Sequence, residues 1–188
     1  MKIVLASKSP RRRELLSLIC KDFEIRVSDA DEEYEEGTPL CIVPRILSER
    51  KAMAVHMAED EIVIGCDTVV LIDNELLGKP KTRERAIEML GKMSGRCHEV
   101  ISGLSVRKGD KIYSEAVSST VYMRKLSDRE IEKYVDEWKP LDKAGAYGIQ
   151  EMAGSFVSRI EGDFYNIVGL PLCRLVEILS EKFGVYLA

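Results

Sequence analysis

The longest nearly apolar stretch of the sequence, residues 61–72, is the feature that most limits what this chain can fold into. It is rich in strand-favouring residues and too short to cross a bilayer, which predicts a buried strand. Asp67 and Thr68 interrupt it. An ionisable side chain in an apolar strand is costly unless it is paired, bound to a metal or at a strand end. Asp67 is therefore a candidate metal ligand or general base, and a turn-capping carboxylate is the alternative.

Strand-like and helix-like segments alternate along the chain. We expect strands at residues 3–6, 23–27, 62–72, 100–106, 112–122 and 156–160. We expect helices after Ser9-Pro10, at about 39–58, at 82–93, from the Ser127-x-x-Glu130 capping box to about Trp138, and from Pro171 to about Gly184. The helix at 39–58 is expected to start irregularly, because Pro44 lies inside it. Residues 29–36 are mostly acidic, which predicts an exposed loop. Strands and helices alternate in the first part of the chain, and the strands at 100–106 and 112–122 form a hairpin in its middle. This order predicts a mixed sheet in an α/β fold.

The bulk composition excludes several classes of protein. The 188 residues fit a single domain with a real core, and the net charge of −4 argues against wholesale binding of nucleic acid. No apolar run is long enough for a signal peptide or a membrane span, so we expect a cytoplasmic protein. The five cysteines lack metal-ligand spacing and are expected to be buried free thiols. His56, expected in the long helix, and His98 do not support a histidine-centred mechanism.

A basic segment, Ser7 to Arg13, lies between the first predicted strand and the first predicted helix and includes the start of that helix. Helix N-termini attract anions, and acidic residues are usual in the first turn, yet three arginines stand there instead. They are useful if they converge on a polyphosphate, because the guanidinium fork matches phosphate oxygens. A solvated basic helix start is the alternative.

Two lysines and a glycine-containing loop are further candidates. Lys51 lies on the long helix, and Lys79 stands between Gly78 and Pro80, which restrict the backbone around it. Surface lysines are the simpler interpretation of both. Residues 141–150 contain glycines that allow close approach to a ligand, and the Gln150 amide could hydrogen-bond a base edge.

Taken together, these segments resemble the Maf family of nucleotide pyrophosphatases over nearly the whole chain. The resemblance rests on the order and spacing of Ala6-Ser7-Lys8-Ser9-Pro10-Arg11-Arg12, Asp31-Glu32, Lys51-Ala52, Asp67-Thr68-Val69-Val70, Gly78-Lys79-Pro80, Ser94-Gly95 with His98-x-Val100, residues 142–150, and Val168-Gly169-Leu170-Pro171. It implies a Maf/ITPase-like α/β fold: an elongated mixed sheet flanked by helices, with two lobes around a central cleft. The same resemblance suggests a homodimer.

The family match also implies a role for individual residues. Phosphate would be bound by Ser7, Arg12, Lys51 and Lys79. Glu32 and Asp67 would hold a divalent cation, Mg²⁺ or Mn²⁺, and Asp67 would be the proton acceptor. The positions that separate the branches of the family by base would be Arg11, Thr68 and Gln150.

The residues at those three positions look like the branch that cleaves dTTP and UTP between the α and β phosphates. One departure is Glu151, where this branch more often has glycine. The expected function is thus hydrolysis of dTTP and UTP, and of modified pyrimidine nucleotides, to monophosphate and pyrophosphate. Three alternatives stay open: a preference for another base, a nucleotide-binding regulator of septum formation that acts in cell-division arrest without turnover, and an RNA-binding module using residues 11–13.

Overall fold

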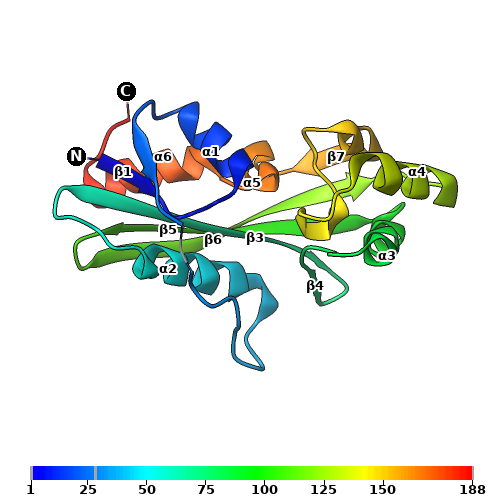
Figure 1. The fold of residues 1–188 in the computed structure, drawn as a ribbon, viewed down its shortest axis with the longest axis horizontal. Helices are drawn as coiled ribbons and strands as arrows, with labels where there is room; N and C mark the ends of the chain where they lie inside the picture. The colour runs from blue at the N-terminus through cyan, green and yellow to red at the C-terminus, as the bar shows by residue number, and fades with distance from the viewer. Residues whose placement is uncertain (1, 28, 188) are drawn as a thin grey trace. The chain divides into compact units, whose positions relative to one another are not determined.

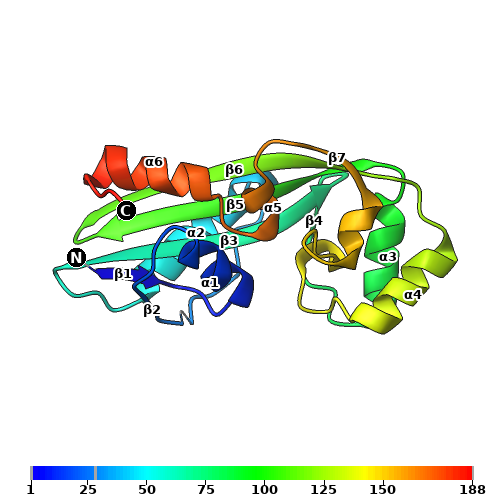
Figure 2. The same cartoon turned by 90° about the horizontal axis from the view of Figure 1, so that it is seen from above.

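A mixed β-sheet runs through the protein and is flanked by helices (Figures 1 and 2). The computed structural model describes residues 2–27 and 29–187. The strand order within these residues is β2-β1-β3-β5-β6-β7, and β4 pairs with β3. The strands are β1 (Lys2–Leu5), β2 (Phe23–Ile25), β3 (Glu61–Ile72), β4 (Glu75–Leu77), β5 (Cys97–Lys108), β6 (Lys111–Met123) and β7 (Val157–Glu161). The predicted mixed sheet flanked by helices is confirmed, whereas the cleft stays a prediction.

The helices match most of the predicted segments. They are α1 (Pro10–Ser17), α2 (Val43–Ala54), α3 (Arg83–Met93), α4 (Asp128–Trp138), α5 (Phe164–Val168) and α6 (Leu172–Phe183), with short 3₁₀ turns at Leu40–Ile42, Ala144–Ala146 and Met152–Phe156. Within residues 2–27 and 29–187, every helix is too short or too polar to span a bilayer.

The chain divides into two compact units. Unit 1 comprises Met1–Thr68, Ser102–Val117 and Tyr165–Ala188, and unit 2 comprises Val69–Ile101 and Ser118–Phe164. The strands β3, β5 and β6 each begin in one unit and continue into the other.

In unit 1, α1 and α6 cover one face of the sheet and α2 covers the opposite face (Figure 1). Two glycines allow α2 to lie close to the strands. A Cβ atom on Gly65 would stand 2.2 Å from the carbonyl oxygen of Ser48, and one on Gly103 would stand 1.8 Å from that of Pro44. Side chains from β1, α2 and β3, and from the residues just after β1 and α2, then form a buried apolar cluster: Val4, Ala6, Ala52, Val55 and Val63. The position of α2 is therefore fixed by direct contact with the sheet.

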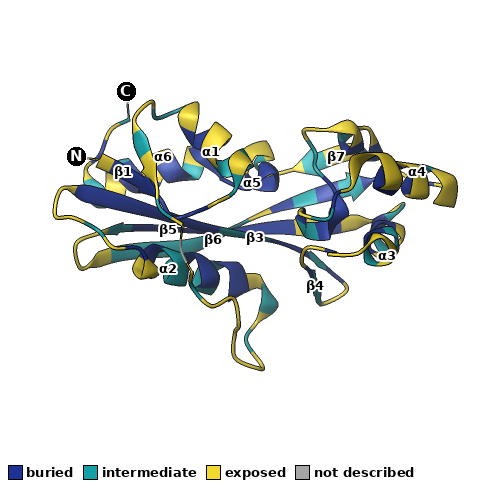
Figure 3. Cartoon of the chain, in the orientation of Figure 1, coloured by how far each residue is buried: buried dark blue, intermediate teal, exposed yellow. Residues whose placement is uncertain are grey.

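In unit 2, α3 packs against α4. Thr82 caps α3 by accepting a hydrogen bond from the Arg85 N–H, and the predicted capping box of Ser127 and Glu130 opens α4. Tyr134 and Phe156 meet edge to face in the core, with ring centroids 5.2 Å apart. Figure 3 shows the outer side of α4 exposed.

The long helix predicted at 39–58 is confirmed in its irregular start and wrong at its end. A 3₁₀ turn precedes α2, and Pro44 lies in the first helical turn, where its missing N–H costs nothing. The helix stops at Ala54 because Val55 is extended (φ −85°, ψ 129°) and packs into the apolar cluster. His56 consequently lies outside the helix. The short elements β4 and α5 were not predicted.

The prediction that the cysteines are buried thiols is also wrong for most of them. All five are free, but only Cys66 is buried, whereas Cys41, Cys97 and Cys173 are exposed. Spacing along the chain argued against a cysteine metal site but carried no information about the exposure of each thiol.

Candidate active site

The parallel strand β1 ends beside the middle of β3, which continues to Ile72, and this pairing brings two of the predicted segments together. Leu5 of β1 is paired with Ile64 of β3. Ser7 and Asp67 follow these paired positions by a few residues. Ligands of α/β proteins gather beyond the carboxyl ends of such strands. The pairing thus explains why residues far apart in the sequence can face one ligand.

Lys51 lies between two carboxylates. Its Nζ atom donates to Asp67 Oδ1 at 2.5 Å and to Glu32 Oε1 at 2.9 Å. The side chains of Lys51 and Asp67 are each 13% exposed, whereas that of Glu32 is 72% exposed. The exposed acidic loop at 29–36 is confirmed, and Glu32 is the member of it that contacts this cluster.

The Lys51 ammonium group is held in its charged form. Burial opposes the charge, but the Asp67 carboxylate and the hydrogen bonds from Lys51 to Asp67 and Glu32 outweigh burial and raise the pKa of Lys51. The cluster therefore presents a charged ammonium group between the carboxyl groups of Asp67 and Glu32.

Arg12 joins three further segments of unit 1. Its Nε donates to the carbonyl oxygen of Gly169 at 2.9 Å, Nη1 to Ser7 Oγ at 3.2 Å, and Nη2 to Thr68 Oγ1 at 3.0 Å. Ser7 is buried and also accepts from the Ser9 N–H. These contacts fix the guanidinium plane and leave N–H groups for a phosphate.

Behind Thr68 lies a partner that sequence reasoning missed. Ser102 is fully buried, its Oγ lies 2.9 Å from Thr68 Oγ1, and it donates to the carbonyl oxygen of Asn166 at 3.2 Å. The Gly169 carbonyl was missed as a functional group as well. The family motif at 168–171 marked its position, but no sequence signal marked Ser102.

The first turn of α1 is basic, as predicted. Pro10 occupies its start, the turn contains no acidic residue, and Ser9 makes no side-chain capping bond. Arg11 is half-buried in this turn. The backbone amides of the turn and the Arg12 guanidinium give this end of α1 an anion-binding character.

The predicted residues Lys79 and Gln150 belong to unit 2, and both side chains are exposed. Their segments are linked, because the Gly145 N–H donates to the Gly78 carbonyl oxygen at 3.1 Å. Gly145 has a φ of +67°, and a Cβ atom there would stand 2.9 Å from Val70 Cγ2. The loop before Gln150 thus approaches the residue before Lys79 at a point that requires glycine.

Two sets of polar contacts, one of them buried, hold the same loop in unit 2. Tyr147 Oη lies 2.7 Å from His98 Nε2, and burial lowers the pKa of His98 to about 4. Lys143 Nζ forms ion pairs with Asp142 at 3.2 Å and with Glu151 at 3.3 Å. Glu151, the departure from the family pattern, therefore ties the end of the loop to its beginning.

Glu32 and Asp67 are suited to a small divalent cation. Both contact the same ammonium group, so one cation can face both, and carboxylate oxygen is the donor that Mg²⁺ and Mn²⁺ prefer. Within the described parts of the chain, three or more acidic, histidine or cysteine side chains do not gather at any such site. Phosphate oxygens and water would complete the coordination, as is usual for Mg²⁺.

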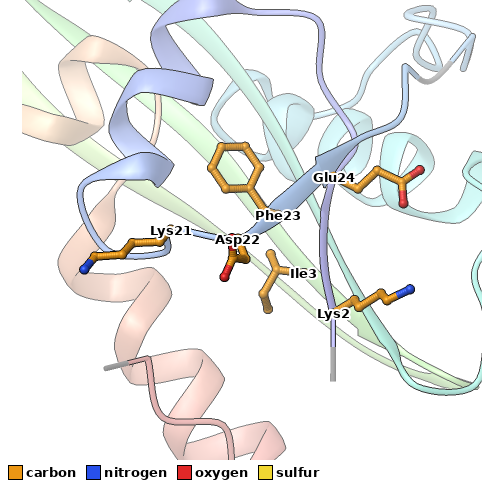
Figure 4. Close-up of a pocket in the computed structure, with 6 residues that line it drawn as sticks. All are labelled: Lys2, Ile3, Lys21, Asp22, Phe23 and Glu24. Carbon is orange, nitrogen blue, oxygen red and sulfur yellow. The ribbon is translucent and has the colours of Figure 1, made fainter.

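A surface pocket of about 360 Å³ lies elsewhere in unit 1 (Figure 4). It is lined by Lys2, Ile3, Lys21, Asp22, Phe23 and Glu24. The predicted phosphate-binding and metal-binding residues do not line it, so it is distinct from the clusters around Lys51 and Arg12.

Comparison with known proteins agrees with the resemblance. The family described as Maf-like protein matches residues 2–182. The dTTP/UTP pyrophosphatase of Thermoanaerobacter sp. (strain X514) is 47% identical over 191 residues, with 100% of both chains covered. That of Alkaliphilus metalliredigens (strain QYMF) is 43% identical and covers 99% of this chain and 98% of its own.

Among solved structures, the Ham1 protein of Staphylococcus aureus is similar at 21% identity and a TM-score of 0.45, covering 68% of this chain and 73% of that one. This similarity is too distant to bear on function. The family match spans nearly every residue, and both relatives align over almost their full length. The chain belongs to the Maf family.

Proposed function

We propose that this protein is a nucleoside triphosphate pyrophosphatase that hydrolyses dTTP and UTP to the monophosphate and pyrophosphate. The relatives named dTTP/UTP pyrophosphatase, at 43–47% identity over their full length, support this substrate class. The cluster of Lys51 with Asp67 and Glu32 is the observation that carries the proposal. It combines a carboxylate base with cationic and acidic groups suited to a phosphate chain.

The proposed roles follow from the contacts. Water attacks the α-phosphorus, the bond to the bridging oxygen of the β-phosphate breaks, and pyrophosphate leaves. Asp67 accepts the proton of that water, because it is a carboxylate largely shielded from solvent. Arg12, Ser7 and Lys51 bind phosphate oxygens, and Lys79 of unit 2 is a further phosphate-binding residue.

We propose that Glu32 and Asp67 hold Mg²⁺ or Mn²⁺. Such an ion supplies charge neutralisation at a phosphoryl oxygen and lowers the pKa of bound water. We assign the choice of base to Arg11, Thr68 and Gln150. Thr68 is held by Arg12 and Ser102, which supports a fixed orientation of its hydroxyl.

Product analysis on a panel of nucleotides with Mg²⁺ and with Mn²⁺ tests the proposal. We expect dTTP and UTP to give monophosphate and pyrophosphate faster than GTP, CTP and ATP. Release of orthophosphate would place the cleaved bond elsewhere and would contradict the assignment. Binding of nucleotide with no turnover would favour the alternative of a regulator that acts in cell-division arrest.

Asp67→Asn is the sharpest test of the proposed base. We expect turnover of dTTP to fall by at least about a hundredfold, because the amide neither accepts a proton nor balances a cation. The measurement is kcat for pyrophosphate release, with a thermal melt to verify folding. Turnover within a few-fold of the wild type would rule out the role.

The remaining parts of the proposal concern the whole chain. We propose that residues 1–188 act as one catalytic domain in the cytoplasm, where free thiols stay reduced. A homodimer is proposed from the family resemblance alone. Light scattering coupled to size exclusion tests it, and a monomer mass at working concentration would refute it.

A further inference from the structure

The Lys51 ammonium occupies the same two carboxylates that the proposed function gives to a divalent ion. It contacts Glu32 from the exposed loop and Asp67 from β3, at 2.9 Å and 2.5 Å. A second cation bound by these oxygens would stand next to the ammonium, and because the Lys51 and Asp67 side chains are largely shielded, solvent would screen the repulsion less than at an open surface. The two cations therefore exclude each other from this position.

We propose that Lys51 is an internal cation that competes with the divalent ion for Glu32 and Asp67, and that ion binding releases its ammonium group to the phosphates of the substrate. This rests on the proposed function, because the ion and the phosphates come from it. Lys51 thereby acts first as a partner of the acidic residues and then as a phosphate ligand.

The fold fixes where the lysine starts and leaves its side chain able to turn. Gly65 and Gly103 seat α2 directly against the sheet, so the Lys51 backbone stays near Asp67. The lysine stem is long and flexible, and its ammonium group can redirect its hydrogen bonds without movement of the helix.

The competition also affects the proposed base. While the ammonium donates to Asp67 Oδ1, that oxygen is not available to the proton of a water molecule. Displacement of Lys51 frees this oxygen when the ion and the nucleotide are bound. The pairing consequently restrains Asp67 in the nucleotide-free protein.

Mn²⁺ binding to the nucleotide-free protein tests the competition without any catalysis. Bound Mn²⁺ is measured by loss of the free-ion electron paramagnetic resonance signal in the wild type, Lys51→Met and Lys21→Met. Lys21→Met is the matched control, because it removes an equal charge from unit 1 at an exposed position in the separate pocket of Figure 4, which neither carboxylate lines. We expect Lys51→Met to bind Mn²⁺ on the order of tenfold more tightly than the wild type, and Lys21→Met to bind within about twofold of it.

Equal or weaker Mn²⁺ binding by Lys51→Met, relative to Lys21→Met, would overturn the proposal. If Lys51→Met does not fold, the wild type provides the second measurement. Labelling of Lys51 by an amine-specific reagent, followed by mass spectrometry, should accelerate when Mn²⁺ is added, and an unchanged rate would overturn the proposal. Neither measurement involves nucleotide. A missing pyrophosphatase activity would therefore refute the proposed function, while the Mn²⁺ binding and labelling results would still decide whether Lys51 competes with the ion.

Discussion

Gln150 and Lys79 are both exposed in unit 2, yet they offer different chemistry to a nucleotide. The Gln150 amide has a donor and an acceptor, which suits a base edge, whereas the Lys79 ammonium is a point charge. We expect Gln150→Ala to change the ratio of kcat/KM between UTP and GTP by about tenfold, because a lost base contact is worth about 1–2 kcal/mol. Steady-state kinetics on the nucleotide panel measures this ratio.

Lys79→Met is the companion variant at the residue scale. It should lower kcat/KM for every nucleotide by a similar factor, since the phosphate chain is common to all of them. If Gln150→Ala left the relative rates on dTTP, UTP and GTP unchanged, the base-reading role would be wrong.

His98 provides a pH prediction. Burial lowers the pKa of His98 from 6.5 to about 4. Between these pH values, His98 therefore binds a proton in the unfolded chain but not in the folded protein. The free energy of unfolding should therefore fall as the pH drops from 6.5 towards 4, by up to about 3 kcal/mol from this residue. Urea unfolding of the wild type and His98→Gln across this window measures the contribution, and the variant should show the shallower dependence.

The comparison of the two proteins isolates the contribution of His98. Carboxylates titrating in the same window affect the wild type and His98→Gln alike and cancel in the comparison. An unchanged slope in His98→Gln would mean that His98 does not stay neutral in the folded protein.

At the scale of elements, the strands and helices with clear periodicity were predictable from the sequence, and their ends were not. The capping residues placed the starts of α3 and α4 correctly. The end of α2 depends on Val55 packing into a cluster that includes residues of β1 and β3, which no local pattern encodes. β4 follows a two-residue turn, Asp73 and Asn74, in which both residues have positive φ values. Asp and Asn accept this conformation, but the pair is a weaker sequence signal for a hairpin turn than Asn-Gly.

The candidate site follows the same division. The basic first turn of α1 and Asp67 in β3 are recognisable from the sequence around them. Only the family resemblance indicated that these distant segments act at one site. The contact of Arg12 with Thr68 joins residues 56 positions apart, and Ser102 reaches Thr68 from another strand. Such contacts depend on strand order, which a single sequence does not specify.

The close approach of α2 to β3 yields a prediction about an element. Gly65→Ala would place a methyl group 2.2 Å from the Ser48 carbonyl oxygen and 2.9 Å from the Ala52 nitrogen, so α2 must shift. We expect a loss of about 1–3 kcal/mol in the free energy of unfolding, as for other overpacked cores. Turnover should fall as well, because α2 carries Lys51. Urea unfolding and pyrophosphate release measure the two effects.

Gly91→Ala is the control for Gly65→Ala. Gly91 lies within α3, and within the described part of the chain no heavy atom beyond its chain neighbours and its own helix backbone comes within 4 Å of the position of its Cβ. Alanine there should stabilise the protein by about 0.5–1 kcal/mol through helix propensity. If Gly65→Ala kept the stability and turnover of the wild type, α2 could move without consequence and the prediction would be wrong.

At the scale of the whole molecule, the question is whether two compact units behave as one domain. β3, β5 and β6 each pass from one unit to the other, and β3 carries Asp67 in unit 1 and the β4 partner residues in unit 2. Unfolding of either unit would release the ends of three strands whose remaining parts belong to the other. We therefore expect one cooperative transition, as for small single domains.

The chain contains its own reporter for this last prediction. Trp138, at the end of α4, is the single tryptophan, so its fluorescence follows unit 2 alone. Reaction of the buried thiol of Cys66, quantified by mass spectrometry of its peptide, follows unit 1. The urea midpoints from the two probes should coincide, and a non-hydrolysable dTTP analogue with Mg²⁺ should raise both by the same amount, because a ligand that binds the folded state stabilises the whole cooperative unit. Midpoints that separate, or a ligand that moves only one of them, would show that the chain unfolds as two domains.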